Sequence, residues 1–176
     1  MKRVPTRIGK AGTKGKGVFA AGPIRRSTVI GSFRGKARWI WEIPQELWPY
    51  TIQVDYDRYV VPRRKGIVWY MNHSCAPNCV ISGSGISAQR DIEKGEELTF
   101  DYSTDVDWAG FKMRCTCGRP DCRKVIRAYR FLPEELKLRY GRHVAKFILR
   151  EYFRRRGSPR SGPAKPAALR AAPQSP

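Results

Sequence analysis

The stretch that decides the fold of this chain is Met71-Asn72-His73-Ser74-Cys75-Ala76-Pro77-Asn78-Cys79. A later run, Cys115-x-Cys117-x4-Cys122, begins a metal site that is one ligand short, because structural zinc is usually held by four ligands in a tetrahedron. The candidates for the fourth ligand are His73, Cys75, Cys79 and His143. Three of the four lie in the first stretch, so a metal ion there would tie two distant segments of the chain together.

The composition describes a chain that can bury a core. Of its 176 residues, 41% are hydrophobic, and no apolar run approaches the roughly 18–20 residues of a membrane span. The basic residues 1–5 lead into no apolar segment, so no signal peptide is expected. Five clustered cysteines favour metal binding in a reducing compartment over disulfides. We expect a soluble monomer without a membrane partner. Its expected location is intracellular, in the cytoplasm or associated with the nucleoid, and the nucleus is an alternative.

The net charge of +20 is unevenly distributed along the chain. Residues 1–38 carry 11 Lys and Arg and no acids, and residues 112–176 carry 18 basic and 4 acidic residues. Residues 39–111 carry 6 basic and 11 acidic residues. Basic ends promote association with nucleic acid, although charge alone fits a solvated surface equally well. The acidic middle is where a cationic substrate could be steered.

Short pieces rich in apolar, β-branched and aromatic residues recur as far as Tyr102, separated by Gly, Pro, Asp or Ser. Such a pattern predicts short strands joined by turns. The pieces are 18–21, 29–33, 37–41, 50–54, 59–61, 67–71, 79–81, 86–88 and 98–102. Residues 1–17 are polar, basic and rich in glycine, which favours a loose arm.

A helix is predicted beyond the cysteine run. Pro133 suits the first helical position, and the two glutamates after it suit the positive end of the helix dipole. Apolar residues then recur at near-helical spacing: Leu136, Tyr140, Val144, Phe147, Ile148 and Tyr152. Gly141 costs about 1 kcal/mol relative to alanine inside a helix, so the helix can break there. From residue 157 onward, Pro, Ala, Ser and Arg dominate and favour disorder.

Three motifs precede the cysteine run in a fixed order. They are Gly15-Lys16-Gly17-Val18-Phe19-Ala20, Asn72-His73-Ser74-Cys75 and Gly95-Glu96-Glu97-Leu98-Thr99-Phe100-Asp101-Tyr102. Together with the cysteine run and Arg123, they resemble the SET-domain protein lysine methyltransferases that carry a post-SET zinc segment. The resemblance extends from about residue 15 to about residue 126.

The resemblance implies an α+β, mainly β fold, in which several small twisted sheets surround a pseudoknot that brings Asn72 and His73 beside Tyr102. It implies a basic flexible arm over 1–14, a SET domain over 15–110 and a post-SET zinc-binding segment over 111–127. The remaining parts are a C-terminal helical extension over 128–156 and a disordered basic tail over 157–176.

The implied activity is transfer of methyl groups from S-adenosylmethionine to the lysine ε-amine of a protein substrate, such as a histone or a basic nucleoid protein. This chemistry needs positioning and a deprotonated amine, with no nucleophilic side chain. Tyr102 resembles the catalytic tyrosine, and Tyr50 resembles a second active-site tyrosine. Phe100 matches the position that limits how many methyl groups fit, and phenylalanine there suggests di- or trimethylation.

Cofactor-binding positions also follow from the resemblance. They are Gly15, Lys16, Gly17, Val18, Asn72, His73 and Tyr102. The resemblance assigns His73 to the cofactor pocket, and it implies that Cys75 supplies the fourth ligand of a structural Zn²⁺, with Cys115, Cys117 and Cys122. Cys79 is then a small buried hydrophobic residue.

The chain departs from the family pattern at 69–71, where Trp-Tyr-Met stands in place of the usual arginine and phenylalanine upstream of the Asn-His pair. The cysteine-rich pre-SET segment of several histone-modifying members is also missing. A different class of function therefore stays open, namely a zinc-stabilised module that binds nucleic acid or chromatin through its basic ends, with weak or no catalysis.

Overall fold

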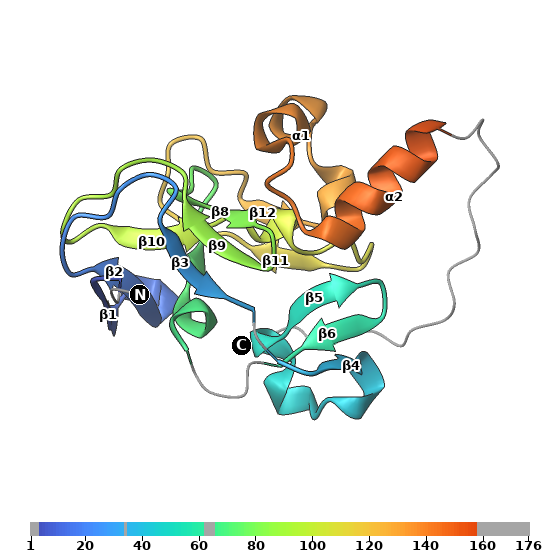
Figure 1. Ribbon diagram of the computed structural model, residues 1–176, viewed down its shortest axis with the longest axis horizontal. Coiled ribbons are helices and arrows are strands. Elements are labelled where there is room, and N and C mark those ends of the chain that lie inside the picture. The colour runs from blue at the N-terminus through green and yellow to red at the C-terminus, as the bar shows by residue number, and fades with distance from the viewer. Residues whose placement is uncertain (1–3, 34, 62–65, 158–176) are drawn as a thin grey trace.

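The computed structural model describes residues 4–33, 35–61 and 66–157. Four small sheets make up most of the domain, and two C-terminal helices lie together over one side of them (Figure 1). The α+β, mainly β architecture expected from the sequence is thereby confirmed. The tail expected from residue 157 onward falls, apart from its first residue, outside the described residues.

The first sheet contains strands from all three ordered motifs. Its strand order is β1 (Thr6–Lys10), β2 (Lys16–Ala20), β10 (Glu97–Phe100) and β7 (Asn72–His73). The short strand β7 runs parallel to β10, with Asn72 opposite Thr99 and His73 opposite Phe100. This pairing brings residues 72–73 beside the segment that ends in Tyr102.

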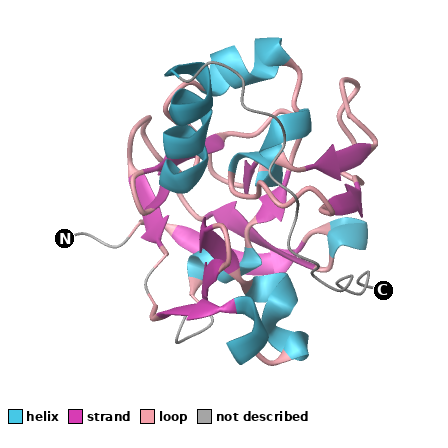
Figure 2. Cartoon of the chain, turned by 90° about the vertical axis from the view of Figure 1, so that its right-hand side faces the viewer, coloured by secondary structure: helices cyan, strands magenta, loops and turns pink. Residues whose placement is uncertain are grey.

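The other sheets are small and antiparallel. One has the order β3 (Val29–Ser32), β9 (Gly85–Ala88) and β8 (Cys79–Ser82), and a second has β4 (Ala37–Trp39), β6 (Arg58–Val60) and β5 (Ile52–Asp55). The third is the pair β11 (Lys112–Arg114) and β12 (Val125–Arg127). Short 3-10 helices lie in the connections between elements, at Gly12–Lys14, Ile40–Glu42, Gln45–Tyr50, Ile67–Tyr70, Tyr102–Thr104 and Tyr129–Phe131. All helices are drawn in cyan in Figure 2.

The helices α1 (Glu134–Tyr140) and α2 (Lys146–Gly157) complete the core. Phe147 and Ile148 of α2 are fully buried in the same cluster as Leu98 of β10. Burying a large apolar side chain stabilises the fold by about 1.5–3 kcal/mol, so the helical extension contributes directly to the stability of the sheets. Within the described part of the chain, no helix is long and apolar enough to cross a membrane.

The N-terminal segment differs from the expected loose arm. Residues 6–10 form β1, which pairs along its whole length with β2. The Arg7 guanidinium lies 5.0 Å from the centroid of the Phe19 ring. Composition suggested an arm because edge strands often carry charged side chains, and their stability comes from backbone pairing that composition does not reveal.

Two further elements differ in detail. Residues 67–70, expected as a strand, form a 3-10 helix, because a short apolar run does not by itself distinguish the two states. Pro133 lies at the N-cap of α1 rather than at its first helical position. Helix α1 is followed by its C-cap Gly141, which has φ of 52°, a left-handed conformation that glycine adopts without strain. The break that the sequence analysis allowed at this glycine is therefore present.

Candidate active site

A pocket of about 310 Å³ contains the three predicted catalytic residues, Tyr50, Phe100 and Tyr102. The Tyr50 ring stacks on Trp69, with 4.2 Å between ring centroids and 14° between ring planes. Trp69 belongs to the segment where the chain departs from the family pattern, so this departure supplies part of the pocket wall. Trp108 also lines the pocket, which makes its wall largely aromatic.

Tyr102 lies at the border of the pocket. Its hydroxyl donates a hydrogen bond to the Met71 carbonyl at 2.9 Å, and its backbone N–H donates to His73 Nδ1 at 3.2 Å. Burial, with smaller contributions from the charges of Glu97 and Asp105, raises the pKa of the hydroxyl far above its ordinary value. The hydroxyl therefore stays protonated and neutral, and its oxygen can still accept a hydrogen bond.

Of the predicted cofactor residues, Lys16 and Gly17 lie close to Asn72. The Asn72 amide donates to the Lys16 carbonyl at 3.0 Å and to Glu97 Oε1 at 2.8 Å. Glu97 also forms an ion pair with Lys14, and the sequence analysis gave neither residue a role. Glu97 lies two residues before Thr99, the partner of Asn72 in the parallel pairing, so its contact with Asn72 becomes recognisable only once the pairing of β7 with β10 is known.

The glycine motif lies in the loop and strand beside Asn72. Gly15 has φ of 77°, a left-handed conformation that glycine adopts without strain. Val18 is completely buried in the core, so its side chain offers nothing to a ligand and only its backbone could. Of the predicted cofactor residues, only Tyr102 also lines the aromatic pocket.

The cysteines form one cluster. The Sγ atoms of Cys75, Cys115, Cys117 and Cys122 all lie within 4.8 Å of one another, and the distance from Cys75 Sγ to Cys115 Sγ is 3.7 Å. A tetrahedral zinc site with Zn–S distances of about 2.3 Å needs sulfur atoms about 3.8 Å apart. The four thiols therefore fit a structural zinc ion in both number and spacing.

The competing ligands lie elsewhere. Cys79 is fully buried in β8, where its thiol donates to Asn78 Oδ1 at 3.5 Å, and burial raises its pKa to about 12. His143 Nδ1 lies 3.2 Å from the Ile81 carbonyl, which makes this nitrogen a donor. Neither residue belongs to the cysteine cluster.

His73 connects the cluster to Tyr102. Because its Nδ1 accepts the Tyr102 backbone N–H, the ring proton is on Nε2, which lies 3.4 Å from Cys75 Sγ. Burial lowers the pKa of His73 to about 4, although the nearby Asp101 opposes that change. The imidazole is therefore neutral and can donate to the Cys75 sulfur, the kind of outer contact that orients metal ligands.

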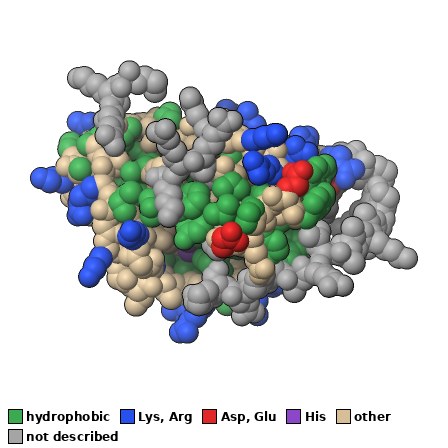
Figure 3. Space-filling view, turned by 90° about the horizontal axis from the view of Figure 1, so that it is seen from below, with side chains coloured by type: hydrophobic (Ala, Val, Ile, Leu, Met, Phe, Trp, Pro, Cys, Tyr) green, Lys and Arg blue, Asp and Glu red, His purple; other side chains and the backbone are tan. Residues whose placement is uncertain are grey.

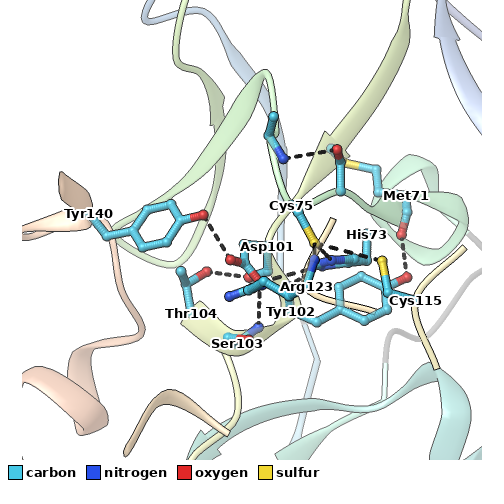
Figure 4. A network of polar contacts seen from close by, with 12 residues as sticks. Met71, His73, Cys75, Asp101, Tyr102, Ser103, Thr104, Cys115, Arg123 and Tyr140 are labelled. Carbon is cyan, nitrogen blue, oxygen red and sulfur yellow. Dashed lines mark hydrogen bonds and ion pairs between the residues drawn. The ribbon is translucent and has the colours of Figure 1, made fainter. Parts of the chain in front are cut away.

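Asp101 joins three parts of the chain beneath the site (Figure 4). Its carboxylate is 1% exposed and accepts hydrogen bonds from Arg123 at 2.6 Å and from the Tyr140 hydroxyl at 2.8 Å. It also accepts from the Ser103 backbone N–H at 3.0 Å. The sequence analysis assigned Asp101 and Arg123 no role, although Arg123 directly follows the last cysteine of the run.

Comparisons with known proteins place this geometry in a family context. The chain is 32% identical over 134 residues to histone-lysine N-methyltransferase trr of Drosophila melanogaster, covering 66% of this chain and 6% of that protein. It is 33% identical over 138 residues to the histone H3-lysine(4) N-trimethyltransferase ATX1 of Arabidopsis thaliana, covering 68% and 13%. The chain thus spans only a small part of these curated relatives.

A solved structure of KRYPTONITE in complex with mCHG DNA and SAH has a similar fold. Its TM-score is 0.57 and its sequence identity is 24%, over 70% of this chain and 29% of that one. Residues 15–103, about half of the chain, match the SET domain family. This match holds all three ordered motifs and the parallel pairing of β7 with β10, and the chain belongs to the SET domain family.

Proposed function

We propose that this chain is an S-adenosylmethionine-dependent protein-lysine N-methyltransferase. The observation that carries the proposal is the position of the Tyr102 hydroxyl, between the aromatic pocket and the strand of Asn72 and His73. A lysine side chain in the pocket and a methyl donor beside Asn72 would meet at this hydroxyl. The names of the relatives, which are histone-lysine N-methyltransferases, support a lysine side chain of a protein as the substrate.

The residues of the pocket would favour the reaction by position and by exclusion of water. S-adenosylmethionine supplies a methyl group on a sulfonium, and the attacking amine must be neutral although free lysine titrates near about 10.4. Aromatic walls desolvate the amine and so lower its pKa. The Tyr102 oxygen and the Met71 carbonyl would orient the amine. Phe100, which has no hydroxyl to occupy space or bind water, leaves room for more than one methyl group.

The partners and the place of action follow from the same proposal. A lysine-rich basic protein, such as a histone or a nucleoid protein, is the proposed substrate, and chromatin or a nucleoid is the proposed site of action. A monomeric enzyme is part of the same proposal. Zn²⁺ held by Cys75 and the post-SET cysteines would fix residues 111–127 against the pocket wall.

The test is methyl transfer from isotope-labelled S-adenosylmethionine to a panel of purified basic proteins that includes core histones and a bacterial nucleoid protein. We expect label on lysine in at least one protein, located by mass spectrometry, and cofactor binding by calorimetry. Self-methylation is counted separately, with the protein alone as the control. Absence of both cofactor binding and transfer across the panel would refute the proposal.

Gly17→Ala should weaken cofactor binding. A Cβ atom at Gly17 would lie 2.7 Å from Glu97 Oε1, 2.8 Å from Ala11 Cβ and 3.0 Å from Asn72 Nδ2. Such contacts displace the Asn72 amide, so we expect roughly a tenfold loss of cofactor affinity, as for one lost hydrogen bond to a charged group. The matched control is Gly22→Ala, whose Cβ would meet only Pro5 at ordinary contact distance. Equal affinity of both variants by calorimetry would contradict this assignment.

A second function, binding of nucleic acid, is favoured by the β11–β12 pair. Lys112 lies directly opposite Arg127, and both side chains are exposed. Like charges at opposed positions destabilise a strand pair, and a polyanion would remove that repulsion. Binding of double-stranded DNA should therefore weaken steeply with salt, and Lys112→Gln should reduce the slope of log affinity against log salt by about one.

A further inference from the structure

Three buried aspartates follow one another closely after β10, and they differ in their partners. Asp101 is bound by Arg123 at 2.6 Å, and Asp107 is bound by Arg130 at 2.9 Å. Asp105 is 5% exposed, yet among the residues that the structure describes no Lys, Arg or His forms an ion pair with it. One buried acid of three therefore lacks a cationic partner within the protein.

Asp105 lines the aromatic pocket together with Tyr59 and Tyr102. The donor that holds its carboxylate is the backbone N–H of Gln53 in β5. Its negative charge acts on both tyrosines, since it contributes to the raised pKa of each hydroxyl, after burial as the main cause. The carboxylate therefore faces the same space in which the proposed catalytic hydroxyl lies.

The fold does not require an acid at this position. The 3-10 helix Tyr102–Thr104 is capped by Asp101, whose side chain accepts from the Ser103 N–H. Asp105 is the C-cap of that helix, but the capping group is its backbone N–H, which donates to the Tyr102 carbonyl at 3.0 Å, so the cap does not use its carboxyl group. Burial raises the pKa of Asp105 to about 8, which means that burial makes ionisation of this carboxyl unfavourable. A buried acid that lines a pocket and has no cationic partner among the described residues points to a cationic ligand.

Aromatic walls and a carboxylate are together the chemistry that recognises an organic cation. Ring faces attract an ammonium through the π-system, and the carboxylate supplies a charge-assisted hydrogen bond. Trp69, Trp108 and Tyr50 provide such rings around the same pocket. A pocket of about 310 Å³ has room for an aliphatic amine with its stem.

We propose that Asp105 is the substrate-binding acid of this pocket, which pairs with the ammonium of an entering lysine or methyllysine side chain and selects cationic over neutral ligands. This inference rests on the proposed function, because it assigns the lysine side chain to this pocket. The inference adds to the proposed function a residue, Asp105, that selects ligands by their positive charge. A carboxylate beside the ammonium raises the pKa of the amine, so this pairing serves binding, and the amine has to move away from Asp105 towards Tyr102 before it loses its proton to solvent.

The test uses n-butylammonium as a probe of the lysine side chain, with n-butanol as a neutral ligand of matched length. Binding to the full chain is followed by NMR at about pH 8.5, where the amine is still a cation. We expect the wild type to prefer the ammonium by about tenfold or more, and Asp105→Asn to lose that preference. Asp57→Asn, which removes a half-exposed carboxylate from the same pocket, should keep most of it.

Several outcomes would overturn the proposal. They are equal binding of the two probes by the wild type, a preference that survives in Asp105→Asn, or a preference lost equally in Asp57→Asn. A measurement on the wild type alone guards against a variant that folds poorly: saturating n-butylammonium should make the Asp105 carboxyl ionise at lower pH in carbon-detected NMR. Because none of these readouts needs methyl transfer, they can fail while the enzyme is active, and they can succeed without turnover.

The pH dependence of thermal stability is an independent measure of the ionisation of the Asp105 carboxyl. An acid whose pKa is raised in the folded state makes folding less favourable as the pH rises from about 4 towards 8. Asp105→Asn should therefore match the wild type near pH 4 and become the more stable protein by pH 8, in thermal unfolding. The other carboxyl that lines the pocket is that of Asp57, and the hydroxyls of Tyr59 and Tyr102, whose pKa values are raised, stay neutral over this range. A variant less stable than the wild type at pH 8 would indicate a structural role instead.

Discussion

Tyr102→Phe is expected to lower the rate of methyl transfer by on the order of 10²–10³-fold, the usual effect of removing one polar group aimed at a transition state. The substitution removes only the hydroxyl, which reaches the Met71 carbonyl at 2.9 Å, and leaves the ring in place. The ring keeps its contact with Phe100, at 5.0 Å between centroids. Cofactor binding should therefore persist, because Asn72 and its partners do not use this hydroxyl.

The measurement combines single-turnover rates with calorimetry of cofactor binding, so that chemistry and binding are separated. Tyr70→Phe is the matched control, since Tyr70 is close in sequence, half-buried and outside the pocket lining. It should retain the wild-type rate. A Tyr102→Phe protein that methylates as fast as the wild type would remove Tyr102 from the mechanism, and equal losses in both variants would indicate a general effect on folding.

Removal of zinc by a chelator is expected to have the second large effect, on folding and on cofactor affinity together. Structural zinc contributes on the order of 10 kcal/mol to the folding of small metal-binding domains. The cluster reaches the site through Cys75, whose sulfur lies 3.4 Å from His73 Nε2, while His73 Nδ1 accepts the Tyr102 N–H. Loss of the metal should release Cys75 and thereby loosen the strand that carries Asn72.

Two cysteine variants make this prediction specific. Cys75→Ser should lower the bound zinc measured by atomic absorption, the midpoint of thermal unfolding and the cofactor affinity. Cys79→Ser changes another buried thiol, which lies outside the cluster, and should keep full zinc content. If chelation left cofactor affinity intact while zinc was lost, the coupling through His73 would be wrong. Full zinc content in Cys75→Ser would instead mean that the fourth ligand is another residue.

The sequence was sufficient for the parts of the site that depend on short motifs. Residues 72–73 and the segment ending at Tyr102 were expected side by side, and they pair in β7 and β10. Cys75 was singled out among four candidate ligands by family resemblance, and spacing alone left the choice open. The role of Zn²⁺ and the catalytic assignments stay predictions for the experiments above.

Other parts could not be read from the sequence because they depend on tertiary contacts. The pairing of β1 is made by backbone groups, which any residue type provides, so a basic composition concealed it. Asp105 and Asp107 look alike in sequence, and only the position of Arg130 makes one of them paired and the other not. Trp69 appeared as a departure from the family pattern, and its contribution to the pocket depends on the ring of Tyr50 lying against it.

The hydrogen bonds to Asp101 have a consequence for the order of events during synthesis. Two partners of its carboxylate are synthesised later: Arg123 comes 22 residues and Tyr140 39 residues further along the chain. Until both have left the ribosome, the Asp101 carboxylate has only its local bond from the Ser103 N–H among the three contacts described above. Distant contacts form slowly because long loops must close first. We expect a nascent chain ending before α1 to hold its β-sheets loosely and to be susceptible to proteolysis. The site would then be completed in a single late step, when α1 and α2 pack against the sheets.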